Sequence, residues 1–400
     1  MNVYKHFPVA NDEVGIIWTL SSIKDACVVE FEPVKNTNCK EKNEGNLNGE
    51  DEAKVHYINI EQGDINFEEY DRLEKAIIEI DKNTDTKYIF IMILTKDPII
   101  KNNILNICES LKDNITAKLI PITTGGLKDE YNVGVEEALE ILANKIVKSN
   151  HKDFNKYNIL GFNIDKYNYV SDVKELERIM KELFNKDVNT IFTADSSIED
   201  IENAGKASLN IVVRKEGLKA AQCMHEKCNI PYIYKNLYGL KNTIKFVEAT
   251  KKIDGYELDE DKYNKEIHHV KKCMFNMKRK LYFYEESKDC AVFGDMDTVT
   301  GMSDMLKELG LKVDRKEILH KIICDELNAT KLERMDYLNN KELLILLGDG
   351  QSIDMYHDSK MDLQVTNTNL DKASICSDTP YIGFRGCVYI IERILHIKTE

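Results

Sequence analysis

The sequence lacks an excess of positive charge. It has 55 lysine and arginine residues against 69 aspartate and glutamate residues, and its formal net charge is -14. Proteins that bind the phosphate backbone of nucleic acids present a basic surface. The composition therefore predicts that neither DNA nor RNA is a main partner.

Long apolar runs are absent as well. A transmembrane helix is indicated by a run of about 18 apolar residues, and no run in this sequence approaches that length. Residues 1 to 10 also lack the apolar core of a signal peptide. We therefore expect a cytoplasmic protein with no membrane partner.

Several common motifs are missing. The 10 cysteines form no Cys-x-x-Cys pair, so neither a zinc ribbon nor a disulfide framework is predicted. No strand is followed by Gly-x-Gly-x-x-Gly or by Gly-x-x-x-x-Gly-Lys-Ser/Thr, the patterns that place a nucleotide phosphate at a helix start. A direct site for NAD or ATP is therefore not indicated.

What the sequence does contain is an alternation of two apolar patterns. Short β-rich runs predict strands that are buried on both faces, at 88–94, 119–122, 190–193, 209–213 and 343–347. Helical spacing of apolar residues lies between these runs, for example around 70–80, 100–111, 135–146 and 173–183. This alternation predicts an α/β protein of three Rossmann-like, doubly wound parallel-sheet domains.

Polar interruptions set the expected boundaries. Residues 1–150 form the first predicted domain, 151–256 the second and 288–400 the third. Between the last two, residues 257–287 repeat apolar side chains at steps of four and three, which predicts one long connecting helix.

Open parallel sheets bind ligands beyond the carboxyl ends of their strands, so polar residues near those ends are candidates for a substrate or cofactor cleft. The candidates are Lys96, Asp195, Asp295, Asp297, Asp349 and Arg385. The segments 294–301 and 348–350 also look like turns in front of helices, with Asp297 or Thr298 suited to cap one. Helix capping alone would explain these residues; the alternative is contact with a ligand at a helix start.

The chain resembles the nitrogenase component 1 oxidoreductases. The likeness covers nearly the whole sequence, and the segments that carry it are Asp12–Leu20, Pro33, Asp71–Ala76, Gly294–Asp297 with Gly301, Leu306, Leu309 and Gly310, and Gly383–Gly386. The resemblance implies three α/β domains, a homodimer or a heterodimer with a paralogue, and an ATP-dependent iron-sulfur reductase as partner. It also implies an iron-sulfur cluster or another metal cofactor, held by thiolates.

The sequence departs from that family at the expected cluster ligands. Asn36 stands where many relatives have cysteine after the first strand, and Lys96 follows Thr95 where another cysteine is usual. The third ligand loop, 123–127, contains no cysteine. Cys39 is the only nearby thiol and is our single candidate metal ligand.

Three functions are consistent with these features. The first is an oxidoreductase subunit that reduces a small molecule or a tetrapyrrole-like substrate with electrons from the iron-sulfur partner. The second is a noncatalytic or regulatory subunit, or a scaffold for a metal cofactor, in a nitrogenase-like system. The third is an unrelated doubly wound enzyme, because a fold does not fix a function.

Overall fold

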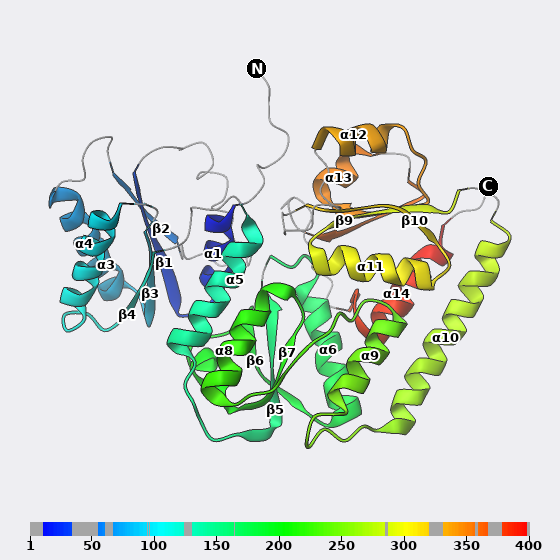
Figure 1. Ribbon diagram of the computed structural model, residues 1–400, viewed down its shortest axis with the longest axis horizontal. Coiled ribbons are helices and arrows are strands. Elements are labelled where there is room, and N and C mark those ends of the chain that lie inside the picture. The colour runs from blue at the N-terminus through cyan, green and yellow to red at the C-terminus, as the bar shows by residue number, and fades with distance from the viewer. Residues whose placement is uncertain are drawn as a thin grey trace.

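The computed structural model describes residues 11–33, 55–60, 67–93, 95, 97–123, 130–163, 165–284, 287–319, 331–356, 359–366 and 378–397. Within these residues, the strands form three parallel sheets of four strands each, and helices lie between most pairs of consecutive strands (Figure 1). The predicted α/β class with three doubly wound sheets is confirmed. No helix of the described residues is both long enough and apolar enough to cross a bilayer.

The first sheet has the strand order β2-β1-β3-β4. Its strands are β1 (Ala26–Pro33), β2 (Val55–Ile60), β3 (Tyr88–Ile93) and β4 (Lys118–Ile122). The associated helices are α1 (Asp12–Ser21), α3 (Phe67–Asn83), α4 (Pro98–Leu111) and α5 (Tyr131–Ile141), the last continued by a π-helical turn, Leu142–Ile146. β3 is buried along its whole length, as its unbroken apolar run predicts for a central strand.

The second sheet has the order β6-β5-β7-β8. Its strands are β5 (Asp153–Phe162), β6 (Asp187–Thr193), β7 (Ala207–Val212) and β8 (Tyr232–Tyr234). Its helices are α6 (Tyr169–Phe184), α7 (Ile198–Glu202), α8 (Leu218–Cys228) and α9 (Leu240–Thr250), with 3-10 turns at Asn203–Lys206 and Lys215–Gly217.

The third sheet has the order β10-β9-β11-β12. Its strands are β9 (Asp289–Gly294), β10 (Lys312–Ile318), β11 (Ile345–Asp349) and β12 (Met361–Thr366). The helices that follow them are α11 (Met296–Glu308), α12 (Lys331–Asn339), α13 (Gly350–Met355) and α14 (Gly383–Leu395).

The predicted long helix is α10 (Glu260–Tyr282), which connects the second sheet to the third. Its buried residues are Tyr263, Val270, Met277 and Leu281, four positions of the repeat that predicted it. α14 packs against α10, α6 and α9, so the C-terminal helix lies on the second unit rather than only on its own sheet (Figure 1). The exact division of the chain into domains stays a prediction.

One local prediction was wrong. Asp295, and not Asp297 or Thr298, is the N-cap of α11, and its side chain accepts a hydrogen bond from the backbone N–H of Thr298 at 3.0 Å. Gly294 is the last residue of β9 and Met296 is the first residue of α11, so only Asp295 lies between them. Asp297 is therefore inside the first turn of the helix and free for other contacts.

Candidate functional site

A group of charged side chains lies where the second and third sheets meet, and four of them are buried while Lys166 and Asp295 are partly exposed. Three strands supply it from their carboxyl ends: β5 leads to Asp165 and Lys166, β7 leads to Arg214 and Glu216, and β9 leads to Asp295 and Asp297. We call these six residues the buried ion cluster. The cluster lies on the side of the strands where open parallel sheets bind their ligands.

Arg214 holds one side of the cluster together. Only 2% of its surface is exposed, and its Nη1 donates to Asp165 Oδ2 at 2.7 Å while its Nε donates to Glu216 Oε2 at 3.0 Å. Gly161, with a φ of +102°, makes room for the arginine, since a Cβ at this position would lie 2.3 Å from Arg214 Cγ. Burial would lower the pKa of Arg214, but the charges of Asp165 and Glu216 outweigh burial and raise it.

Lys166 and Asp295 form the second pair. The Lys166 Nζ lies 3.0 Å from Asp295 Oδ2 and 3.4 Å from Thr298 Oγ1. Burial alone would raise the pKa of Asp295, but the charges of Lys166 and Arg214 hold it well below its ordinary value. This carboxylate stays ionised, caps α11 and fixes the lysine at the same time.

Asp297 behaves differently from Asp295. Its Oδ1 accepts a hydrogen bond from the Tyr234 hydroxyl at 2.6 Å, and its Oδ2 accepts one from the backbone N–H of Lys215 at 2.8 Å. Burial and the charge of Glu216 raise the pKa of Asp297 to about 6. A carboxyl with this pKa gains and loses a proton near neutral pH, which is a property typical of functional acids and bases.

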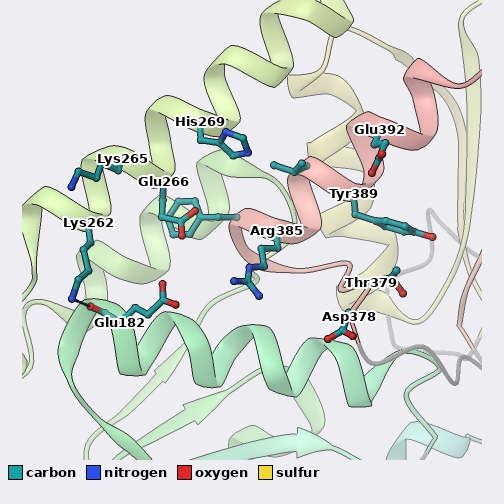
Figure 2. A pocket seen from close by; sticks show the side chains of 12 residues that line it. Glu182, Lys262, Lys265, Glu266, His269, Asp378, Thr379, Arg385, Tyr389 and Glu392 are labelled. Carbon is teal, nitrogen blue, oxygen red and sulfur yellow. Dashed lines mark hydrogen bonds between the residues drawn. The ribbon is translucent and has the colours of Figure 1, made fainter.

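The other predicted residues lie apart from the cluster. Arg385, in the first turn of α14, lines a pocket of about 690 Å³ between α6, α10 and α14, where Figure 2 shows its guanidinium among Glu182, Glu266 and Asp378. Asp349 is the N-cap of α13 and accepts from Ser352 N at 2.9 Å. Asp195 is exposed in the turn after β6, with a φ of 57°.

Two predicted residues, Lys96 and Cys39, lie outside the described residues. The structure thus brings together Asp295 and Asp297 from the predicted set, and ligand binding by any of the set stays a prediction. The sequence interpretation missed Asp165, Lys166, Arg214 and Glu216. A usable signal was present, because Arg214 directly follows the predicted strand at 209–213 and Asp165 follows the apolar run that ends at Phe162.

The thiols that the structure describes do not fit an iron-sulfur cluster. Cys27, Cys108 and Cys290 are buried in apolar surroundings, and burial raises the pKa of each thiol to about 12, 11 and 12 respectively. Cluster iron is held by thiolates, which such sites disfavour. Among the described residues, no three His, Cys, Asp or Glu side chains are grouped so as to hold a metal ion. The role of Cys39 as a ligand stays a prediction.

The family model of the nitrogenase component 1 type oxidoreductases matches residues 13–398. The chain belongs to this family. The family resemblance predicted from sequence is therefore confirmed, and the buried ion cluster is a feature of a nitrogenase component 1-type chain.

Curated relatives carry several names. The nitrogenase iron-molybdenum cofactor biosynthesis protein NifE of Clostridium pasteurianum is 24% identical over 308 residues, which cover 72% of this chain and 66% of the relative. The nitrogenase molybdenum-iron protein alpha chain of the same organism is 25% identical, over 64% of this chain and 48% of the relative. A light-independent protochlorophyllide reductase subunit of Crocosphaera subtropica is 26% identical, over 39% of this chain and 32% of the relative. The alignments thus span between about a third and two thirds of these relatives.

A solved structure titled "Nitrogenase Cp1 at pH 6.5" superimposes with a TM-score of 0.79. The superposition covers 99% of this chain and 93% of that chain, at 14% sequence identity. At this identity the likeness shows the fold of the nitrogenase component 1 type, and the function has to be argued from the site.

Proposed function

We propose that this chain is an oxidoreductase subunit of the nitrogenase component 1 type. It reduces a small molecule or a tetrapyrrole-like substrate, bound beyond the carboxyl ends of β5, β7 and β9, with electrons from an ATP-dependent iron-sulfur partner. The observation that carries the proposal is Asp297, a buried carboxyl in the ion cluster with a pKa of about 6.

Reduction of an organic substrate consumes protons together with electrons. A proton donor must be protonated at the working pH and must be able to lose its proton there. Asp297 meets both conditions, because burial and Glu216 favour its protonated form while Tyr234 and the Lys215 N–H stabilise its carboxylate. The salt-bridged Asp295 stays ionised and cannot serve in this way.

The test uses the full chain, purified without oxygen from its native host, with sodium dithionite as the electron donor. We expect a bound group whose absorption changes on reduction, at a rate that depends on pH around 6. Asp297→Asn should keep the bound group but lose this pH dependence, with a rate about 10- to 100-fold lower at neutral pH.

Asp304→Asn is a matched control, because Asp304 lies on the same helix, α11, with an exposed side chain. It should leave the rate and its pH dependence unchanged. Wild-type protein that is colourless, free of metal and unresponsive to dithionite, also after treatment with iron and sulfide, would refute the oxidoreductase proposal.

That outcome would favour the noncatalytic or regulatory form of the second candidate, whose other form is a scaffold for a metal cofactor. Two observations support this candidate. Of the relatives named above, NifE aligns with the largest share of this chain, 72%. The described thiols, in addition, do not fit a cluster that would relay electrons.

In either role we propose that the chain works as a homodimer or as a heterodimer with a paralogue, associating through the first unit. The family supports this arrangement. A protein that sediments only as a monomer at micromolar concentration, alone and with its paralogue, would contradict it.

A further inference from the structure

The pocket between α6, α10 and α14 is separate from the buried ion cluster, because no residue of the cluster lines it (Figure 2). Its volume of about 690 Å³ falls within the range of about 300 to 1,000 Å³ that is usual for small-molecule sites. Phe384, Val388 and Tyr389 of α14 give the pocket an apolar wall, while most of its other lining side chains are charged. The pocket is therefore suited to a small organic molecule that carries charge.

The charges of the lining side chains nearly balance. Three are cations and four are carboxylates: Lys262, Lys265, Arg385, Glu182, Glu266, Asp378 and Glu392. Figure 2 shows the two lysines at one end of the pocket and Asp378 with Glu392 at the other, with Arg385 between them. Because the two signs are separated in space, a simple anion or a simple cation would match only one end.

Some of these charges already have partners within the protein. Arg178 Nη1 donates to Glu182 Oε2 and to Glu266 Oε1, at 2.6 Å each. Lys262 Nζ lies 3.0 Å from Asp259 Oδ2. The lining charges that remain for a ligand are Lys265, Arg385, Asp378 and Glu392.

Arg385 lacks a close anionic partner among the described residues. Its Nε lies 3.9 Å from Glu175 Oε2, and Glu175 is already held by two hydrogen bonds from Arg178. Arg385 is also in the first turn of α14, which has no acidic residue, and the positive end of the helix dipole opposes a cation there. A carboxylate bound by the guanidinium would offset both positive charges, and two parallel hydrogen bonds would orient it.

The other three side chains are exposed, and none of them forms an ion pair within the part of the chain that the structure describes. We propose that the pocket binds a small zwitterion whose carboxylate and ammonium groups lie at opposite ends of an apolar chain, as in an ω-amino acid. The carboxylate binds Arg385 and Lys265, the ammonium group binds Asp378 and Glu392, and the chain lies along the apolar wall. This ligand is distinct from the substrate that is reduced beyond β5, β7 and β9.

Three probes that share a six-carbon chain test the charge requirement: 6-aminohexanoate, hexanoate and hexylamine. Each is titrated into the full chain at neutral pH, and ligand-observed NMR measures its dissociation constant. 6-Aminohexanoate should bind in the millimolar range, as expected for a molecule of this size. Hexanoate and hexylamine should each bind at least about 10-fold more weakly, because each leaves the charges at one end of the pocket without a partner.

Two paired changes identify the end that binds each group. In Lys265→Ala with Arg385→Ala the carboxylate has lost its cations, so 6-aminohexanoate should bind no more tightly than hexylamine. In Asp378→Asn with Glu392→Gln the ammonium group has lost its carboxylates, so 6-aminohexanoate should bind no more tightly than hexanoate. All four side chains are exposed, and both variants should therefore fold.

Lys278→Ala is the matched control, because Lys278 is exposed on the same helix, α10, but does not line the pocket. It should bind 6-aminohexanoate as wild type does. Equal binding of the three probes to wild type would overturn the proposal, and so would wild-type affinity in both paired variants or no detectable binding of 6-aminohexanoate. None of these measurements involves electron transfer, so their failure would leave the proposed reduction untouched.

Discussion

Asp297 binds its proton more tightly in the folded protein than in an unfolded chain. Burial and the charge of Glu216 raise its pKa from an ordinary 3.8 to about 6. Between these two pH values the folded state holds a proton that the unfolded state has lost, so the contribution of Asp297 to stability falls as pH rises. Above pH 6 the raised pKa of Asp297 lowers the free energy of unfolding by about 3 kcal/mol, since one pKa unit corresponds to about 1.4 kcal/mol.

Asp297→Asn should remove this pH dependence. Wild type should lose about 2 to 3 kcal/mol of its free energy of unfolding as the pH rises from about 4 to about 7, and the variant should not lose it. Urea denaturation at both pH values measures the difference. Tyr234→Phe should instead make stability depend more steeply on pH, because loss of the hydrogen bond raises the pKa of Asp297 further. Equal pH dependence in wild type and Asp297→Asn would contradict the assignment.

At the scale of elements, α1 and α5 approach each other through glycine. A Cβ added to Gly134 would lie 1.9 Å from the backbone oxygen of Asp12, and one added to Gly15 would lie 2.3 Å from that of Tyr131. Backbone atoms cannot yield as a flexible side chain can. The position of α1 against α5 therefore depends on the absence of a side chain at both residues.

Gly134→Ala should consequently destabilise the protein by about 2 to 4 kcal/mol, even though alanine favours a helix by about 1 kcal/mol over glycine. Urea denaturation measures the loss. Gly310→Ala is the comparison, because a Cβ there meets nothing within 4 Å and only the φ of +88° opposes it. It should cost about 1 kcal/mol. Similar costs for the two changes would show that α1 can move away from α5.

The sequence predicted the strands and helices well, but it did not predict the helix N-cap or the partners of buried charged side chains. β3 and β11 could be predicted because buried parallel strands are continuous apolar runs. The N-cap of α11 could not be placed, because Asp295 and Asp297 are both suitable and the choice depends on where β9 ends. The partners of Arg214 could not be predicted either, because Asp165 lies 49 residues away and meets it only through the pairing of β5 with β7.

At the scale of the whole molecule, α14 joins units that are separate in sequence. Near its start, Tyr381 N donates to Asp172 at 2.7 Å and Arg385 N donates to Glu175 at 3.0 Å, and both acceptors lie on α6. One hydrophobic core contains side chains of β5, β7, α10, β9 and α14. The second and third sheets therefore share a core, although the sequence predicts separate domains for them.

Phe384→Ala tests how far this shared core couples the two sheets. Phe384 is fully buried in α14, and its ring lies 6.3 Å from that of Tyr263 on α10, so truncation should cost about 3 to 5 kcal/mol. Hydrogen exchange followed by mass spectrometry should show a loss of protection in β5 and β7 together with β9 and β11. Ile89 and Ile91 of β3 belong to a separate hydrophobic cluster in the first sheet, and that cluster should lose less protection from exchange. If protection fell only in the third sheet, residues 288–400 would form an independent folding unit, and the shared core would be too weak to couple it to the second.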